Sequence, residues 1–433
     1  MADFSFSSGI KSLLTTLFLT SVIVVSLVGN VCGAGFQLYN EMSARTAAMG
    51  AAAVARSDIA ELAWFNPAGA AMMERPEIVG GLSLIYPGME FQNDNGRDYE
   101  MKDHLFPIPH LYMAAPLGKY FGASLSLNSP YGLTTDWDRD WLGNRRSVLT
   151  DLKTIYISPS FSFSPCPHVS FGAGPQFVYG TAELRKYSLY DDTILVPVPG
   201  VGNVPATGSM YARMEGDDWG YGYSLSMLIK PVDLIQIGLV YHSEVDLDLH
   251  GRAKFDISGE PLFQAAMGSI YKRQDMWLDL TLPATFTIGI TTTFLKDIRL
   301  SADFLWTEWS SYDSLDFEFE SLPTSRNPKK WKDVWSYRFG IEYTYSPVWQ
   351  FRASYVYDES PIPDDRREPM LPTNDRHIFG FGVGWTRHNL GIDAGYSYVL
   401  VEDASPGKIS TPELSGQYDG DAHIFNISMR WTF

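Results

Sequence analysis

The chain has 433 residues, 14% of them aromatic, and a mean hydropathy of only -0.10. A protein that crosses a membrane with helices would be far more apolar on average, so this composition excludes that class. The formal net charge of -17 at pH 7 argues against nucleic acid as a partner, because nucleic-acid interfaces are basic.

The first residues have the pattern of an export signal. An apolar run at 13–28 follows a lysine and leads into the small-residue sequence 31–34, with no charged stop-transfer flank. We therefore expect residues 1–33 to be a cleaved signal peptide and not a membrane anchor. Lipidation at Cys32 is the alternative, but the preceding residues match a lipoprotein signal poorly. Cleavage leaves Cys166 alone, which predicts a mature chain without an internal disulfide.

Residues 34–75 do not alternate as a strand would. They are rich in Ala, Gly, Met and Ser, and Asn66-Pro67 would break a regular element. The segment is too short to form a core of its own. We expect it to be an N-terminal hatch, a plug inside the lumen of the barrel that follows.

Residues 76–433 predict an all-β fold, a transmembrane antiparallel β-barrel. In such a barrel apolar lipid-facing side chains alternate with polar or small luminal ones, because successive side chains point to opposite faces. Residues 219–229 follow this pattern with large apolar side chains at odd positions, and so does the terminal strand that ends at Phe433. Long polar connections alternate with short turns, which predicts about fourteen strands with the short turns in the periplasm.

The stretch 235–250 continues the alternation, with apolar side chains at most odd positions. This phase would place His242, Glu244, Asp246, Asp248 and His250 together on the luminal face. A metal or acid–base site is conceivable there, but luminal faces are polar in any barrel, so we predict no catalytic residue, metal or cofactor. No GxSxG, HExxH or phosphate-loop motif is present, and 93–96 predicts a turn in preference to a calcium loop.

Two of the expected long loops are unusually apolar. The third contains Ile194, Leu195, Val196 and Val198, and the fourth contains Leu262, Phe263, Met267 and Ile270 at helical spacing. Apolar loop residues must either pack together or bind something. A lid formed by the two loops and an apolar groove that captures a ligand are therefore both open at this point.

Four short motifs occur in order along the chain: Gly35-Phe36-Gln37-Leu38, Asn66-Pro67-Ala68, Asn128-Ser129-Pro130-Tyr131-Gly132-Leu133 and Tyr357-Asp358-Glu359-Ser360-Pro361-Ile362-Pro363. Each is weak alone. Together with the expected plug, the strand number and the terminal phenylalanine, they resemble the FadL/TodX family of outer-membrane transporters of hydrophobic compounds.

The resemblance implies a fourteen-stranded barrel in which cargo is captured at extracellular loops, binds beside the hatch, and leaves sideways into the membrane. The hatch residues it implicates in gating are Phe36, Asn66, Pro67 and Ala68. The exit it implies is a kink in the third strand at Ser129, Pro130, Tyr131 and Gly132. Long-chain fatty acids are the expected cargo, although the substrate loops match too loosely to exclude an aromatic hydrocarbon.

The residues of the third strand themselves favour a break. Pro130 cannot donate to a strand ladder, and Gly132 permits backbone angles that other residues avoid. Within lipid, the freed backbone groups would need partners from Asn66, its neighbours or luminal water. The alternative is that Pro130 merely ends the strand at the membrane surface.

An anionic head group would need a cation in the lumen. On the fifth strand Phe177 and Tyr179 share the lipid-facing phase, which leaves Gln176 and Lys186 pointing inward. Lys186 is therefore the candidate for the head group, with a solvated lysine at the base of a loop as the alternative.

The remaining expectations concern the class of function and the partners. A general diffusion porin and an outer-membrane enzyme acting on lipid are the rival functions. We expect a monomer surrounded by outer-membrane lipid in a Gram-negative cell, assembled by the barrel-assembly machinery through Phe433.

Overall fold

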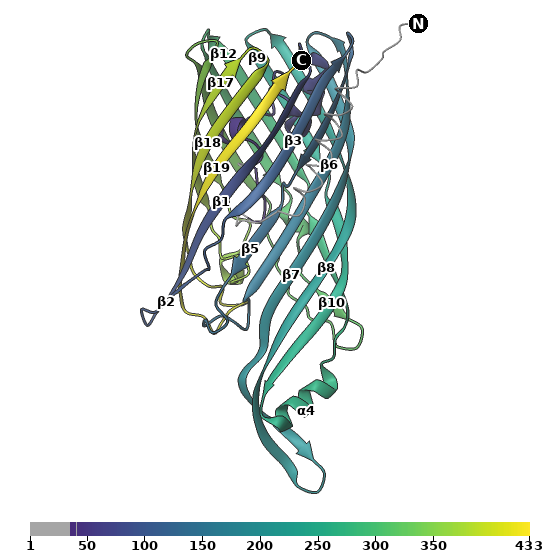
Figure 1. The fold of residues 1–433 in the computed structure, drawn as a ribbon, viewed down its shortest axis with the longest axis vertical. Helices are drawn as coiled ribbons and strands as arrows, with labels where there is room; N and C mark the ends of the chain where they lie inside the picture. Colours follow the sequence, from purple (N-terminus) through teal and green to yellow (C-terminus); the bar gives the residue numbers. More distant parts are fainter. Residues whose placement is uncertain (1–34, 40) are drawn as a thin grey trace.

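The structure of the protein is a computed structural model that describes residues 35–39 and 41–433, so the predicted signal peptide lies outside the described residues. The strands form one closed antiparallel barrel of 14 strands that takes up 63% of the chain, as predicted. The C-terminus and the short turns lie at one end of the barrel, and the long connections lie at the other (Figure 1). No helix in the described part of the chain is long and apolar enough to span a membrane.

Several barrel strands consist of two consecutive segments. The first seven are β1 (Glu77–Asn93), β3 (Phe106–Leu117), β4 with β5 (Phe121–Asn128 and Gly132–Asp136), β6 (Leu149–Cys166), β7 (Val169–Val198), β8 (Gly202–Val232), and β9 with β10 (Ile235–His242 and Val245–Gly259). The other seven are β11 with β12 (Gln274–Leu282 and Thr285–Leu295), β13 (Ile298–Thr307), β15 (Val334–Thr344), β16 (Trp349–Asp358), β17 (Arg376–Arg387), β18 (Leu390–Ala404) and β19 (Gly416–Thr432). Pairing of β1 with β19 closes the barrel.

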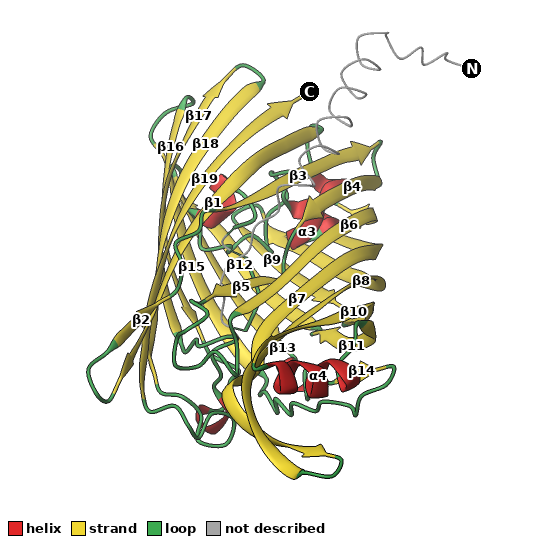
Figure 2. Cartoon of the chain, turned by 60° about the horizontal axis from the view of Figure 1, so that its bottom comes forward, coloured by secondary structure: helices red, strands yellow, loops and turns green. Residues whose placement is uncertain are grey.

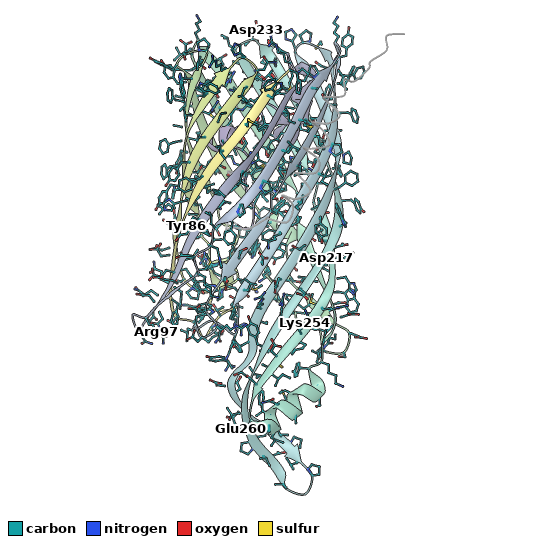
Figure 3. The ribbon with its side chains drawn as sticks, viewed as in Figure 1. Tyr86, Arg97, Asp217, Asp233, Lys254 and Glu260 are labelled. Atoms are coloured by element: carbon teal, nitrogen blue, oxygen red, sulfur yellow. The ribbon has the colours of Figure 1, made fainter. Side chains whose placement is uncertain are left out.

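The alternation of the sixth strand is as predicted. Trp219, Tyr221 and Tyr223 are exposed on the outer surface, whereas Ser224 and Ser226 are buried on the luminal side. Figure 3 places Asp233 at the short-turn end and Glu260 near the opposite tip. The apolar outer belt lies between these ends, which fits the outer membrane as the solvent of this surface.

The predicted luminal face of the seventh strand is wrong beyond His242. Val245, Leu247 and Leu249 are buried inside, and Asp246, Asp248 and His250 are exposed outside. On the side of β8, the ladder pairs Ser224 with His242, stops, and resumes where Asp217 pairs with His250. Between these two pairs the seventh strand has one residue more than the sixth strand. A one-residue excess is a bulge, and it exchanges the two faces of every residue that follows.

Three long connections contain regular structure, of which only the helix in the fourth was predicted. The apolar third connection is an extension of β7 and β8, which pair as far as Val198 and Gly202 and so form a long hairpin beyond the barrel. The fourth contains the helix α4 (Pro261–Ile270), as its helical spacing predicted. The first connection is closed by the short strand β2 (Asp98–Glu100), which pairs with β1 across the turn at 93–97.

The N-terminal segment lies inside the barrel wall, where it forms the short helices α2 (Ala44–Ala47) and α3 (Leu62–Phe65) and the 3-10 helix η2 (Pro67–Met72) (Figure 2). Arg45 is buried and its guanidinium lies 2.5 Å from Glu61 Oε2 and 2.7 Å from Glu77 Oε1 on β1. Asp303 on β13 accepts hydrogen bonds from the backbone amides of Ala53 and Val54, at 2.8 and 2.9 Å.

A second ionic network lines the wall near the short turns. Arg352 lies 2.7 Å from Glu342 and 2.8 Å from Asp393, and Glu342 is also 3.5 Å from Arg56 of the N-terminal segment. These charges are buried, so each depends on its partners for the loss of hydration. The segment is therefore held to several strands by groups that are costly to separate.

Arg45→Met should loosen the N-terminal segment selectively. The change leaves Glu61 and Glu77 buried without their guanidinium, at a cost of roughly 3–5 kcal/mol. Limited proteolysis should cut within residues 41–73 more rapidly than in the parent, while the barrel keeps its resistance to unfolding by heat in detergent. Arg97→Met, in the exposed turn labelled in Figure 3, is the control and should change neither property. Equal proteolysis of the Arg45 variant and the parent would contradict this role.

Candidate functional site

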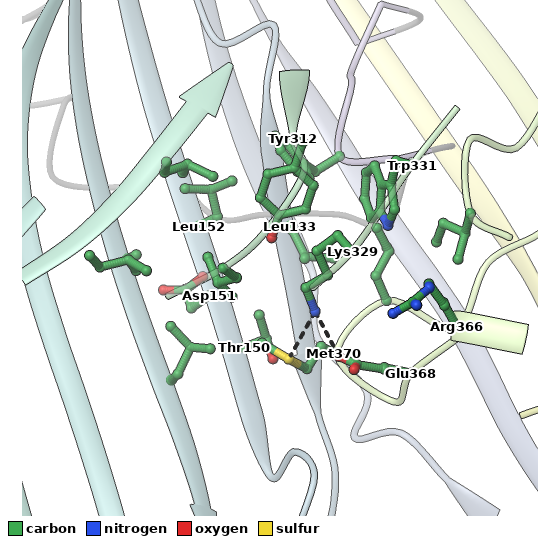
Figure 4. A pocket seen from close by; sticks show the side chains of 18 residues that line it. Leu133, Thr150, Asp151, Leu152, Tyr312, Lys329, Trp331, Arg366, Glu368 and Met370 are labelled. Atoms are coloured by element: carbon green, nitrogen blue, oxygen red, sulfur yellow. Dashed lines mark hydrogen bonds and ion pairs between the residues drawn. The ribbon is translucent and has the colours of Figure 1, made fainter. Parts of the chain in front are cut away.

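An apolar cavity lies in the lumen between the N-terminal segment and the long-loop end. Its volume is about 50 Å³, so the cavity is narrow. Its wall comes from strands and connections far apart in the sequence (Figure 4). The apolar lining residues are Phe36, Leu133, Leu152, Ala182, Leu184, Leu278, Leu280, Tyr312, Leu315, Trp331, Ile362, Met370 and Leu371.

One side of this apolar cavity is charged. Lys329 Nζ lies 2.7 Å from Glu368 Oε2 and 3.9 Å from the sulfur of Met370, and both contacts are drawn in Figure 4. Lys329 and Glu368 are nearly buried, so the pair has lost most of its hydration. The ion pair joins the connection before β15 to the connection before β17 in the lining of the cavity.

A second cavity, which is polar, adjoins the apolar one and shares Thr150, Leu184, Glu368 and Met370 with it. Its cations are Arg146, Arg185, Lys186 and Arg326. Arg146 is bound to Glu413, and Arg185 to Glu183. The two cavities together form an apolar chamber with a cationic end.

Lys186 has no hydrogen-bond or ion-pair partner in the part of the chain that the structure describes. It lies on β7 beyond the aromatic pair Tyr179 and Trp219, towards the long loops and outside the apolar belt. Burial lowers the pKa of this ammonium group, and Glu368 opposes that effect in part. An unpaired, partly desolvated cation facing a cavity is suited to an anionic group of a ligand.

The third barrel strand is interrupted between Asn128 and Gly132. Its first segment pairs with β3 as far as Leu111 opposite Leu127, and its second segment pairs only with β6. Residues 106–110 of β3 therefore have no ladder partner on this side. We refer to the resulting gap in the ladder between the second and third strands as the window.

The window has two ends. Backbone pairing of β3 with β4 bounds it towards the short turns. Towards the long loops, the amide of Lys102 donates to the carbonyl of Asp136 at 2.8 Å, and His104 Nε2 lies 3.0 Å from an Asp136 carboxylate oxygen. The free edge of β3 carries Pro107 and Pro109. Proline has no amide hydrogen and is tolerated at such edges.

The N-terminal residues cover the window from the inside. The amide of Leu38 donates to the Pro130 carbonyl at 2.7 Å, and the amide of Gly132 donates to the Phe36 carbonyl at 2.9 Å. Thr154 Oγ1 on β6 donates to the Tyr131 carbonyl at 2.6 Å. Backbone groups that a break releases from the ladder need other hydrogen-bond partners, and these bonds supply them.

Two details of the expected break differ. Asn66 does not serve it: its Nδ2 donates to the carbonyls of Val54 and Met227, at 2.7 and 3.0 Å. Gly132 is absent from the residues with positive φ and begins the segment β5 opposite Lys153. The break therefore depends on a pairing partner from the N-terminus more than on an unusual backbone angle.

The end of the N-terminal segment is fixed to the wall at β7 and β8. In addition to the bond from Asn66 to Met227 on β8, the Ala68 amide donates to Ser226 Oγ at 2.9 Å, and Ser170 Oγ donates to the Ala68 carbonyl at 2.7 Å. Pro67 begins the 3-10 helix η2 directly after Asn66. Buried side-chain and backbone groups thus tie this motif to two strands.

The apolar residues of the third and fourth connections lie away from both cavities. Phe263 and Val196 are buried in a small cluster that Ile194, Leu262 and Met267 also join. Leu195 and Ile270 remain exposed, and Val198 is half-buried. Most of these residues therefore pack the two connections on each other, which is the arrangement expected of a lid formed by the two loops.

The sequence did not reveal most of the apolar residues that line the luminal cavity. Leu278 and Leu280 point inward on β11, while Asp275 and Asp279 point outward. A strand that is apolar inside and acidic outside has the reverse of the membrane pattern. That reversal was readable in the sequence and marks wall segments that lie beyond the membrane.

The five residues predicted to share the luminal face at 242–250 form no common site. His242 is stacked on Trp64 of the N-terminal segment, with ring centroids 4.2 Å apart, and bonds Gln176 at 2.7 Å. The other four lie on the exterior after the bulge. Among the described residues, no group of three or more His, Cys, Asp or Glu side chains is arranged to hold a metal ion.

A closed fourteen-stranded barrel with an apolar luminal cavity defines an outer-membrane transport protein for hydrophobic compounds. Residues 24–433 match the family model described as outer membrane protein transport protein (OMPP1/FadL/TodX), and the chain belongs to this family.

Known relatives agree with this assignment over nearly the full length. The chain is 27% identical to a long-chain fatty acid transport protein of Escherichia coli O6:H1, over 96% of this chain and 99% of the relative. It is similar in fold to a Pseudomonas aeruginosa FadL homologue (TM-score 0.82, 21% identity, covering 92% and 100% of the two chains). The P. putida toluene transporter TodX is also similar (TM-score 0.71, 18% identity, covering 92% and 99%).

Asn66→Ala should reduce uptake of a hydrophobic compound without preventing assembly. The alanine removes the bonds to Val54 and Met227, so the end of the N-terminal segment loses one of its two bonds to β8 and its bond to Val54. Uptake should be compared with the parent at equal surface level, with Asn203→Ala in the exposed hairpin as the control. Unchanged uptake would mean that Asn66-Pro67 is only a turn into the first strand.

Proposed function

We propose that this protein carries long-chain fatty acids across the outer membrane by lateral release. The long connections would face the exterior and capture the cargo, the two adjoining cavities would bind it, and the window would release it into the bilayer. Residues 1–33 would be removed as a signal peptide, and residues 34–75 would act as the hatch. The observation that carries the proposal is an apolar chamber with a cationic end beside an interrupted wall strand.

The shape of the chamber supports an amphiphilic anion as the cargo. An acyl chain would lie among Leu133, Leu152 and Leu280, and the carboxylate would lie near Lys186. Burial of about fifteen methylenes would contribute on the order of 12 kcal/mol at about 0.8 kcal/mol each. Full burial would make release slow, so a cavity that accepts only part of the chain fits a transporter.

Phe36 supports a link between the cavity and the window. Its ring lines the apolar cavity, and its carbonyl accepts the amide of Gly132 at the edge of the window. Leu133, the next residue of β5, also lines the cavity. A ligand that displaces Phe36 would therefore disturb the pairing that covers the window, which connects occupancy to opening.

The resemblance in sequence to a long-chain fatty acid transport protein supports the same cargo, while similarity in fold to a toluene transporter keeps an aromatic hydrocarbon as the second candidate. The unpaired ammonium of Lys186 favours the acid, since a neutral hydrocarbon would not compensate its desolvation. A porin would instead conduct ions, so single-channel conductance of the purified protein separates that function. Mass spectrometry of co-purifying small molecules would identify the natural cargo.

Lys186→Met should weaken binding of oleate by roughly 1.5–3 kcal/mol, because a charge-assisted bond to the carboxylate is lost. Binding of a neutral hydrocarbon of similar length should be unchanged. Both affinities can be measured on the purified protein in detergent. Lys254→Met, which removes an exterior lysine paired with Glu215, is the matched control. An equal loss for both ligands would indicate a change in the fold of the cavity and would contradict the head-group role.

Replacing Pro130 by Val and Gly132 by Thr should close the window, because both changes favour continuous strand and Val restores an amide donor. The double variant should remain resistant to heat and bind oleate, but its uptake into cells should collapse. Normal uptake by the well-folded double variant would contradict lateral release. It would favour the simpler interpretation, in which Pro130 only ends a strand.

A further inference from the structure

A hydrogen bond crosses the lumen between the window and a second break in the wall. The Tyr131 hydroxyl, which extends from the interrupted part of the third strand, donates to the Pro283 carbonyl at 2.9 Å. Pro283 lies between β11 and β12, in the eighth strand of the barrel. The bond therefore joins two strands that are separated by four others in the closed sheet.

The break at Pro283 makes its carbonyl available to the lumen. The ladder of β10 with β11 ends at Val245 opposite Leu282, and the ladder of β9 with β12 begins at His242 opposite Thr285. Residues 283–284 thus have no ladder partner on that side, next to the bulge of the seventh strand. A carbonyl freed from its ladder and buried requires another donor, and the phenol supplies it.

The N-terminal residues that cover the window are held between these two points. Gln37 forms a β-bridge with Tyr131, and its Oε1 accepts a hydrogen bond from Thr307 on the ninth strand at 3.2 Å. The ring of Phe36 contacts that of Tyr131 edge to face, with centroids 6.1 Å apart. Tyr131 is itself 4% exposed, so its phenol has no water to replace the Pro283 carbonyl.

We propose that the Tyr131 hydroxyl is a latch: it keeps the window closed by tying the interrupted strand, and residues 36–38 paired with it, to the break in the eighth strand. The proposal rests on lateral release and adds a positioning residue to it. Opening requires the covering residues to leave Pro130 and Gly132, and Tyr131 lies at the centre of that set. Loss of the hydroxyl removes a bond that exists only when the window is closed, so the equilibrium shifts towards the open form.

Tyr131→Phe is the direct test, because it keeps the ring contacts and removes only the hydroxyl. Uptake of radiolabelled oleate by cells of a host without its own long-chain fatty acid transporter should rise about three- to tenfold in maximal rate. Equilibrium binding of oleate to the purified protein should not weaken, because Tyr131 lines neither cavity and no contact with the ligand is lost. Hydrogen exchange should become faster at the amides of Leu38 and Gly132, which bond across the window.

Tyr156→Phe is the matched control. Tyr156 is also buried, its ring lies 6.1 Å from that of Tyr131, and its hydroxyl makes no hydrogen bond within the described part of the chain. This variant should behave as the parent in uptake, binding and exchange. Thr307→Val, which removes the bond to Gln37, should change exchange at Leu38 in the same direction as Tyr131→Phe.

The outcomes separate the latch from lateral release itself. Unchanged exchange at Leu38 and Gly132 in the Tyr131 variant would overturn the latch, and so would an equal effect of Tyr156→Phe. Faster exchange together with lower uptake would also overturn it, since an opened window should not slow passage. If the double variant that combines Pro130→Val with Gly132→Thr transports normally, lateral release fails, and the exchange of Leu38 in Tyr131→Phe still decides whether the phenol holds these residues in place.

Discussion

Backbone amide and carbonyl groups have no water to bond inside a bilayer, and this single constraint governs the architecture of the protein. It explains why pairing of β1 with β19 closes the sheet. It also explains why, in the described part of the chain, the strands of the outer belt have unpaired edges only at the breaks. Where the ladder does open, at 129–131, substitute partners come from the N-terminus and from Thr154. The N-terminal segment is thus part of the hydrogen bonding of the wall as well as a filling of the lumen.

The segment can meet this demand because it is itself firmly held. Arg45 with its two carboxylates and Asp303 with two backbone amides fix it to strands on different sides of the barrel. Buried ionic groups of this kind contribute little net stability but strongly disfavour any arrangement that separates them. By contrast, residues 36–38 are joined to the wall through hydrogen bonds and ring contacts, which cost less to exchange. The structure therefore combines a fixed body near the short turns with a more easily displaced end beside the window.

The strands mark the boundary of the outer membrane by which of their two faces is apolar. Within the belt, large apolar side chains face outward, as at Trp219 and Tyr221. Towards the long loops the pattern reverses, and β10 and β11 are apolar inside and acidic outside. The reversal supplies the apolar wall of the luminal cavity through Leu278 and Leu280. The apolar cavity thus lies where the barrel extends beyond the outer belt and can form an ordinary apolar core.

By itself the sequence determined the closed barrel, the phase of the sixth and the last strands, the helical fourth connection and the family, because these follow from local alternation and from motifs in fixed order. It also located the interruption at Pro130 from the missing amide donor. Only the tertiary structure decided which groups meet: Phe36 with Gly132, Tyr131 with Pro283, and Lys186 with the cavity that Glu368 borders. The inside-out phase at 245–250 also needed the structure, since a one-residue bulge has no local signature in the alternation. Contacts across a lumen depend on register around the whole closed sheet, and no short stretch of sequence specifies that register.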